Sequence, residues 1–100
     1  MGITNTTIYS TDVNIQAYFF KIIGHPARLS MLRILQKYES VDISQIALLI
    51  PLAKSTLRSH LMILKENLLI EVVIVEKSVC YKLHFTFRPL VHTILKACET

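Results

Sequence analysis

The sequence is poor in residues that several functional classes require. Its two glycines form no glycine-rich phosphate loop, and its two cysteines, Cys80 and Cys98, have no CxxC neighbour. A disulfide framework is therefore excluded, and a reducing, cytoplasmic compartment fits best. The sequence shows no paired carboxylates and no nucleophile beside a base, so nothing in it predicts an enzyme.

Long hydrophobic runs are also missing, although hydrophobic residues make up 52% of the 100 residues. The longest uncharged run in the apolar middle, Ile43 to Ala53, is well short of the roughly 18 to 20 residues that a spanning helix needs. The N-terminus lacks the basic and apolar regions of a secretory signal. We therefore expect a single domain with no membrane partner, whose excess apolar surface is buried against another subunit.

Acidic residues are absent from one window of the chain. All seven acids lie outside the window from Ile43 to Lys65, whereas Lys54, Arg58 and Lys65 lie inside it, and the whole chain has a net charge of +4. Such a window suits contact with a polyanion such as DNA. On charge alone, an ordinary solvated helix face explains it equally well.

Three helices are predicted in the first half of the chain. Apolar spacing predicts one from Asp12, its N-cap, to Gly24, which we expect in the left-handed conformation. His25-Pro26 opens a second, with Leu29, Leu32 and Leu35 buried and Arg28, Arg33 and Lys37 on the other side. After a connection at Tyr38 to Val41, a short helix from Ile43 to Leu49 is capped by Asp42 or Ser40 and ended by Pro51.

The second half combines helices with a hairpin. A helix from about Lys54 carries a buried stripe of Leu57, Leu61, Leu64 and Leu68. Two runs, Val72 to Val75 and Val79 to Phe85, flank the polar turn Glu76-Lys77-Ser78 and predict a β-hairpin. In the second run, alternation predicts one buried face, made of Val79, Tyr81, Leu83 and Phe85. A last helix opens at Pro89.

This order predicts a mainly α fold with a small β-hairpin, the layout of a winged helix-turn-helix. Ala47 is small where the paired helices approach closely, and Leu57, ten positions later, is the apolar contact from the second helix. We expect an N-terminal tail at 1–11 and one DNA-binding domain at 12–100, with the terminal helices forming a dimer interface.

Two segments carry a resemblance to a known family, the ArsR/SmtB family of dimeric winged-helix repressors. The family's opening pattern, an apolar residue followed by Gly-His-Pro, Arg-Leu and Ile-Leu, resembles IIGHPARLSMLRIL here. Its helix-turn-helix resembles ISQIALLIPLAKSTLRSHLMILKENLLI, and the place of its wing is taken by EVVIVEKSVCYKL. The resemblance covers Lys21 to Leu83.

The resemblance implies a homodimer that presents two recognition helices to successive major grooves of double-stranded DNA. It also implies repression altered by an inducer, which the sequence does not identify. The expected interface consists of apolar residues of the first and last helices, which also carry apolar stripes: Ile15, Phe19, Ile22, Leu90, Val91, Ile94 and Leu95.

The departures from the family pattern concern sensing and the wing. The stretch Ser40-Val41-Asp42-Ile43 replaces the Cys-Val-Cys type motif, and His92 has neither His nor Glu at the third position after it, so we predict no metal and no cofactor. A Cys80–Cys98 disulfide competes with two inert thiols. The helix-ending glycine near Leu68 is absent, and Asn67 is the substitute. The wing lacks glycine and arginine, which leaves Lys77 and Lys82 for phosphate.

Helical geometry selects the DNA-reading residues. With Leu57 at the centre of the buried face, Ser55 and Ser59 lie on the opposite face of the helix. Thr56 and Arg58 lie on the flanks of that opposite face. N-capping is the alternative role of Ser55 and Thr56, and packing against the preceding helix is that of His60. The predicted DNA-binding set is Lys54, Ser55, Thr56, Arg58, Ser59, His60, Lys65, Lys77 and Lys82.

A second hypothesis is a protein-interaction module. In this case the winged-helix dimer has lost most DNA contact and offers its apolar wing, Val72 to Val75, as a docking edge. The salt dependence of binding to duplex DNA separates the two hypotheses.

Overall fold

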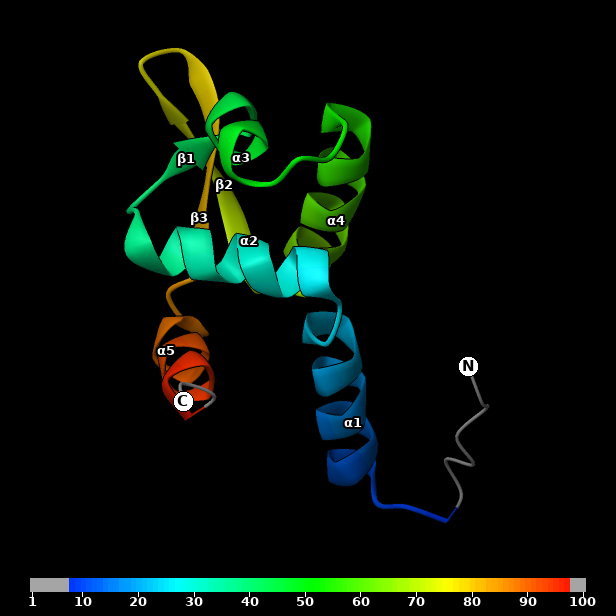
Figure 1. Ribbon diagram of the computed structural model, residues 1–100. Coiled ribbons are helices and arrows are strands. Elements are labelled where there is room, and N and C mark those ends of the chain that lie inside the picture. The colour runs from blue at the N-terminus through cyan, green and yellow to red at the C-terminus, as the bar shows by residue number, and fades with distance from the viewer. Residues whose placement is uncertain (1–7, 98–100) are drawn as a thin grey trace.

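The computed structural model describes residues 8–97. Residues 1–7 of the predicted tail lie outside this range, as does Cys98, for which a disulfide with Cys80 was considered as an alternative. Figure 1 shows the chain in order: α1 (Thr11–Ile23), α2 (Pro26–Lys37), β1 (Val41–Asp42), α3 (Ile43–Leu49), α4 (Lys54–Glu66), β2 (Ile70–Val75), β3 (Ser78–Leu83) and α5 (Arg88–Ala97). This arrangement confirms the predicted winged helix-turn-helix.

The ends of the first three helices follow from local hydrogen bonds. Ser10, rather than the predicted Asp12, caps α1, because its Oγ accepts a hydrogen bond from the Val13 amide at 3.2 Å. His25 caps α2 through Nδ1, which accepts from the Ala27 amide at 3.1 Å. Asp42 and Gln45 form a capping box at the start of α3, with both hydrogen bonds at 2.8 Å.

Gly24 follows α1 for a different reason from the one predicted. Its φ is −77°, so it is not left-handed. A Cβ at this position would lie 2.9 Å from the carbonyl oxygen of Phe20, closer than real Cβ atoms approach. Gly24 therefore permits the close turn between α1 and α2 through its size.

The end of α4 corrects the predicted leucine stripe. Leu57, Leu61 and Leu64 are buried as predicted, but α4 ends at Glu66 and Leu68 is 60% exposed. Leu68 has a φ of 59°, which is costly for a branched side chain. This left-handed residue turns the chain so that Leu69, and not Leu68, enters the core.

The wing belongs to a three-stranded antiparallel sheet in the order β1-β3-β2. β1, which the sequence analysis treated as a connection, pairs Val41 with Tyr81 and Asp42 with Cys80. The β2–β3 turn consists of Glu76 and Lys77, both at positive φ, as a two-residue hairpin requires.

The predicted alternation along β3 is only partly correct. Leu83 is buried and Tyr81 is partly buried, as expected, but Val79 and Phe85 are exposed and Cys80 is buried. Cys80 is covered because it pairs with β1 on one side and β2 on the other. Phe85 lies beyond the end of β3, so the two-residue period no longer applies to it.

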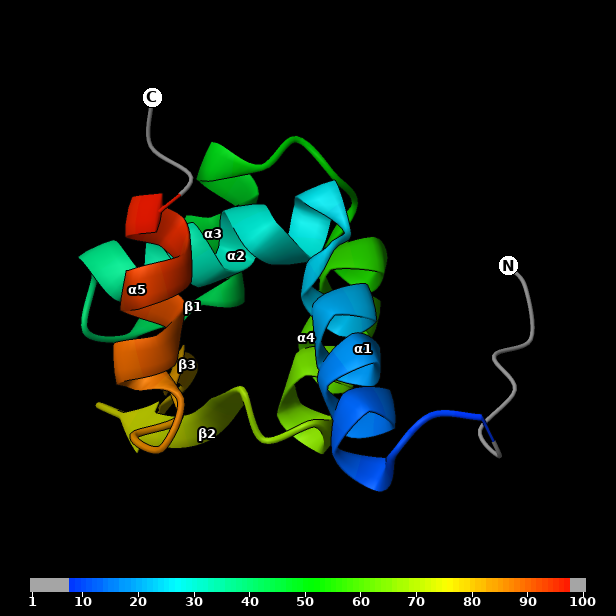
Figure 2. The same cartoon turned by 90° about the horizontal axis from the view of Figure 1, so that it is seen from below.

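The core sits around α2, which crosses the molecule between the helix-turn-helix and wing on one side and the terminal helices on the other (Figure 1). Seen from below, α1 and α5 flank α2 (Figure 2). Within residues 8–97, no side chain with a polar or charged group is buried. The fully buried side chains are Met31, Leu32, Leu35, Ile46, Leu57, Leu61, Leu64, Leu69, Ile70 and Leu83.

In the part of the chain that the structure describes, no single helix is long and apolar enough to cross a membrane. The bent pair α3 and α4 passes that test together by length and composition only.

Candidate nucleic-acid interface

The geometry of α3 and α4 is that of a helix-turn-helix. The two helices are joined by a short break at Pro51 and enclose an angle of 110°, within the usual range for this motif. Ile46 of α3 and Leu57 of α4 are fully buried, and Ala47 packs against the same core. The break and the buried contacts hold α4 at the edge of the domain (Figure 1).

The first turns of α4 present the predicted readers to solvent. Lys54, Ser55, Thr56, Arg58 and Ser59 are all exposed. Ala53 is the N-cap, and no side chain caps the helix, so the alternative role of Ser55 and Thr56 as caps is not observed. The Ser55 and Thr56 side chains are therefore exposed at a helix start that no side chain caps.

Two of these polar groups are already engaged within the protein. The hydroxyl of Ser59 donates to the carbonyl oxygen of Ser55 at 3.1 Å, which leaves its oxygen free to accept. Lys54 Nζ donates to Ser44 Oγ at 3.2 Å and so joins α4 to α3. The side chains of Ser55, Thr56 and Arg58 make no such contact in residues 8–97, so all three are available to a ligand.

His60 lies on the inner flank of α4, away from the exposed readers. Its Nδ1 accepts a hydrogen bond from Arg28 Nε at 3.3 Å, and its ring centroid lies 4.5 Å from that of His25. Partial burial lowers the pKa of His60, and the nearby His25 and Arg28 lower it further. His60 therefore packs within the protein, but its contacts are with Arg28 and His25 at α2 and not with the preceding helix α3, as the alternative for it proposed.

Arg28 is the site residue that the sequence analysis misplaced. It was assigned to the solvated side of α2, but it is partly buried between three helices. Besides its bond to His60, its Nη1 donates to the carbonyl oxygen of Ile22 at the end of α1, at 3.1 Å. Because Arg28 and His60 are far apart in the sequence, no local pattern pointed to this contact.

The wing offers one available cation. Lys77 is exposed at the hairpin tip, whereas Lys82 forms an ion pair with Glu71 across β3 and β2, with Nζ and Oε1 3.7 Å apart. Lys82 is thus partly neutralised by its own sheet. Lys65 is exposed in the last turn of α4, away from the entry end.

The predicted dimer residues divide into surface and core. Ile22 and Val91 are buried within the protomer, so they support the terminal helices instead of forming a surface. Ile15 and Leu90 are exposed, and Phe19, Ile94 and Leu95 are partly buried. An apolar cavity of about 450 Å³ lies between α1 and α5 and is lined by residues of both, including Ile15, Phe19, Leu90 and Ile94.

Metal-ligating residues do not converge in the described residues. No group of three or more His, Cys, Asp or Glu side chains lies close enough to hold a metal ion in residues 8–97. Cys80 is a buried free thiol.

Together, the paired helices, the hairpin and the exposed entry end of α4 define a winged helix-turn-helix protein. Solved structures with this fold include HlyU from Vibrio cholerae, with a TM-score of 0.77 and 16% identity over 90% of this chain and 98% of that chain. The transcriptional repressor BigR from Xylella fastidiosa matches with a TM-score of 0.73 and 24% identity, over 89% of this chain and 91% of that one. NolR from Sinorhizobium fredii matches with a TM-score of 0.76 and 23% identity, over 97% of this chain and 91% of that one.

At such identities these structural matches establish the fold, which is the one that the sequence resemblance implied. No protein-family model and no curated protein matches the chain.

Proposed function

We propose that this protein is a sequence-specific DNA-binding transcriptional regulator, a homodimeric repressor of the ArsR type. The observation that carries the proposal is the entry end of α4, where Ser55, Thr56, Arg58 and Ser59 are exposed on an uncapped helix start within a helix-turn-helix. Several structural neighbours are described as transcriptional regulators, and BigR as a transcriptional repressor, which supports the same class.

In the proposed complex, α4 enters the major groove with its first two turns. Arg58 donates two hydrogen bonds to guanine, the commonest specific contact, and the Ser55, Thr56 and Ser59 hydroxyls contact base edges or backbone. Lys54 and Lys65 position the helix on phosphates, with Lys77 of the wing as a further phosphate contact. Glu66, the only acid of α4, lies at the opposite end and does not oppose this approach.

The homodimer is proposed from the apolar surface of the terminal helices. α1 exposes Ile15, Tyr18 and Phe20, and its apolar cavity with α5 opens beside them. Clustered exposed apolar side chains of this kind mark interaction surfaces. In the proposed dimer a two-fold axis passes through this surface, and binding to successive grooves requires the two α4 helices to lie about 34 Å apart along the duplex.

Binding to short mixed-sequence DNA duplexes over a range of salt concentrations tests the proposal. The logarithm of the association constant should fall linearly with the logarithm of the salt concentration, because phosphate contacts release counterions. Selection from a random duplex library should then enrich a two-fold symmetric sequence. A salt slope of zero, or no binding at low salt, counts against DNA binding.

One observation favours the protein-interaction module as a second candidate. β2 is an edge strand of the sheet, and the wing exposes Ile74, Val75 and Val79. An exposed apolar edge strand is a template for strand pairing with another chain. Two results together would favour this candidate. The protein would bind a purified partner protein and lose this binding in Ile74→Lys, and its affinity for DNA would not depend on the salt concentration.

A further inference from the structure

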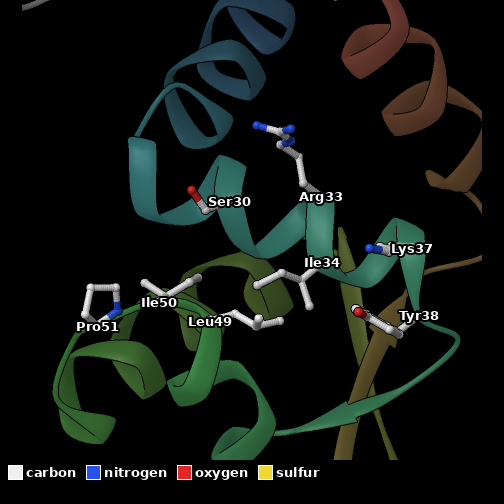
Figure 3. Close-up of a pocket in the computed structure, with 8 residues that line it drawn as sticks. All are labelled: Ser30, Arg33, Ile34, Lys37, Tyr38, Leu49, Ile50 and Pro51. Atoms are coloured by element: carbon white, nitrogen blue, oxygen red, sulfur yellow. The ribbon is translucent and has the colours of Figure 1, made fainter.

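A cleft of about 420 Å³ lies between α2 and the end of α3, on a part of the molecule that neither the DNA face nor the terminal helices use. Figure 3 shows its eight lining residues. Ile34, Leu49 and Ile50 face one another across it, Pro51 closes one end, and Lys37 and the Tyr38 hydroxyl stand at the other. The volume is within the range of small-molecule sites.

The charges around the cleft are all of one sign. α2 contains no acidic residue, and Arg33 and Lys37 are exposed on the same side of it, one helical turn apart. Within residues 8–97 neither forms an ion pair, and Lys37 instead lies over the Tyr38 ring, with Nζ 5.5 Å from the centroid. Two like charges at this spacing repel each other, so an anion close to them is favoured.

The remaining surface of the cleft is apolar. Ile34 comes from α2, Leu49 from α3, and Ile50 and Pro51 from the helix-turn-helix break. Leu49 is exposed, although the adjacent Ile50 is buried in the core. Covering these side chains removes apolar surface from water, which favours a ligand with a hydrocarbon portion. The cleft thus matches an acidic head at one end and an apolar tail along the floor.

We propose that this cleft binds a small amphipathic anion, an organic acid with an aliphatic tail. Its carboxylate contacts Lys37 and the Tyr38 hydroxyl, its tail lies between Ile34 and Leu49, and Arg33, whose side chain extends away from the cleft floor in Figure 3, adds positive charge at the rim. Charge-assisted hydrogen bonds to the carboxylate give the site its preference for acids over alcohols and amines of the same length.

Occupation of the cleft connects to the orientation of α4. The tail contacts Leu49, Ile50 and Pro51, which form the break that sets the 110° angle between α3 and α4. A ligand that binds one setting of this break more tightly shifts the position of the recognition helix. This regulatory part rests on the proposed function, since it names the chemical class of the inducer, whereas binding of the anion does not depend on it.

The test uses octanoate as the probe and the full-length protein labelled for NMR. Backbone signals of Ser30 to Tyr38 and Leu49 to Pro51 should shift with saturation, and octanol and octylammonium should bind more weakly. Lys37→Gln should weaken octanoate binding about tenfold, because it removes a charge-assisted contact, and Arg33→Gln should weaken it less, because Arg33 contributes only its charge at the rim.

Lys21→Gln is the matched control. Lys21 also lies over a tyrosine ring, that of Tyr18, with Nζ 6.0 Å from the centroid, but on α1. This variant should bind octanoate as the unmodified protein does. Equal binding of octanol, equal affinity in Lys37→Gln, or shifts confined to the cavity around Ile15 and Leu90 would each overturn the site.

A second measurement separates the site from the proposed function. Octanoate should lower the affinity for a short DNA duplex by at least about fivefold in the unmodified protein and have no effect in Lys37→Gln. DNA binding that octanoate leaves unchanged overturns the regulatory part. If octanoate binds in the cleft but DNA is not bound at any salt concentration, the proposed function fails and the anion site stands.

Discussion

The Nδ1 atom of His60 accepts a hydrogen bond from Nε of Arg28 at 3.3 Å, and this contact connects α4 to α2. The same arginine donates to the carbonyl oxygen of Ile22 at 3.1 Å, so one side chain joins α1, α2 and α4. His25 adds its ring to the cluster. The orientation of α4 therefore depends on a histidine that must accept, and so be neutral at Nδ1.

This cluster predicts a loss of stability in acid. The pKa of His60 is lowered mainly by burial and also by His25 and Arg28, so the unfolded chain takes up a proton at a higher pH than the folded protein does. The stability that His60 contributes is therefore present above the ordinary histidine pKa of about 6.5, and it is lost as the pH falls through the lowered pKa of the folded protein. Urea unfolding as a function of pH measures it.

His60→Gln should flatten this pH dependence, because glutamine does not titrate. His92→Gln removes an exposed histidine on α5 outside the cluster, and this variant should still lose stability in acid as the unmodified protein does. An unchanged pH profile in His60→Gln would show that other groups cause the loss.

Arg58→Ala should weaken binding to the selected operator by about 1 to 3 kcal/mol, because Arg58 is the proposed guanine reader. The variant should also discriminate less between the operator and a sequence changed at one guanine. Arg88→Ala removes the same charge at the exposed start of α5, away from α4, and should change operator affinity much less. Equal losses of operator affinity in both variants would show that Arg58 contributes only its charge and does not read a base.

Leu61→Ala should lower the free energy of unfolding by about 2 to 5 kcal/mol, since it leaves a cavity in the core. Leu61 is 1% exposed and packs among residues of the main cluster. The adjacent Met62 is 54% exposed, and Met62→Ala should change stability by less than about 0.5 kcal/mol. Urea unfolding midpoints of the two variants check the burial pattern of α4 directly.

Leu68→Gly should raise stability by about 1 kcal/mol. Leu68 holds a φ of 59°, where a Cβ is costly, and being 60% exposed it has little apolar burial to lose. Leu48→Gly is the opposite case, because Leu48 is 86% exposed but lies in α3, and it should cost up to about 1 kcal/mol. If both glycines destabilise, the conformation at Leu68 is not strained.

Ile15→Asp should convert the proposed dimer into monomers, since it places a charge on the apolar surface of α1 where Ile15 is 62% exposed. Light scattering after size-exclusion chromatography measures the mass. Ile74→Asp alters a similarly exposed isoleucine of the wing, 67% exposed, and should leave the dimer intact. Dissociation by the second change alone would move the interface to the wing.

Much of the helical framework was predictable because its signals are local. Pro26 within the first turn of α2, the Asp42–Gln45 capping box and the break at Pro51 each act over a few residues. The spacing of Leu57, Leu61 and Leu64 fixes the buried side of α4 and therefore also its exposed side. For this reason the proposed readers lie on the surface as expected, whereas the roles of these residues in DNA binding remain predictions.

Local signals failed where distant segments meet. β1 is only two residues long, too short for a pattern, and exists because Val41 and Asp42 pair with β3. That pairing buries Cys80, which the alternation of the hairpin alone placed on the wrong face. Leu68 continues the helical spacing perfectly, but the chain turns at this residue and delivers Leu69 to the core instead.

The sequence by itself determined the order of helices, the Asp42 cap of α3 and the winged helix-turn-helix class, because hydrophobic period and capping chemistry are properties of neighbouring residues. Only the tertiary structure decided that Arg28 and His60 bond, that Lys82 is paired with Glu71, and that α2 and the end of α3 enclose a cationic cleft. Each of these contacts joins separate elements, and their meeting depends on how the whole core packs.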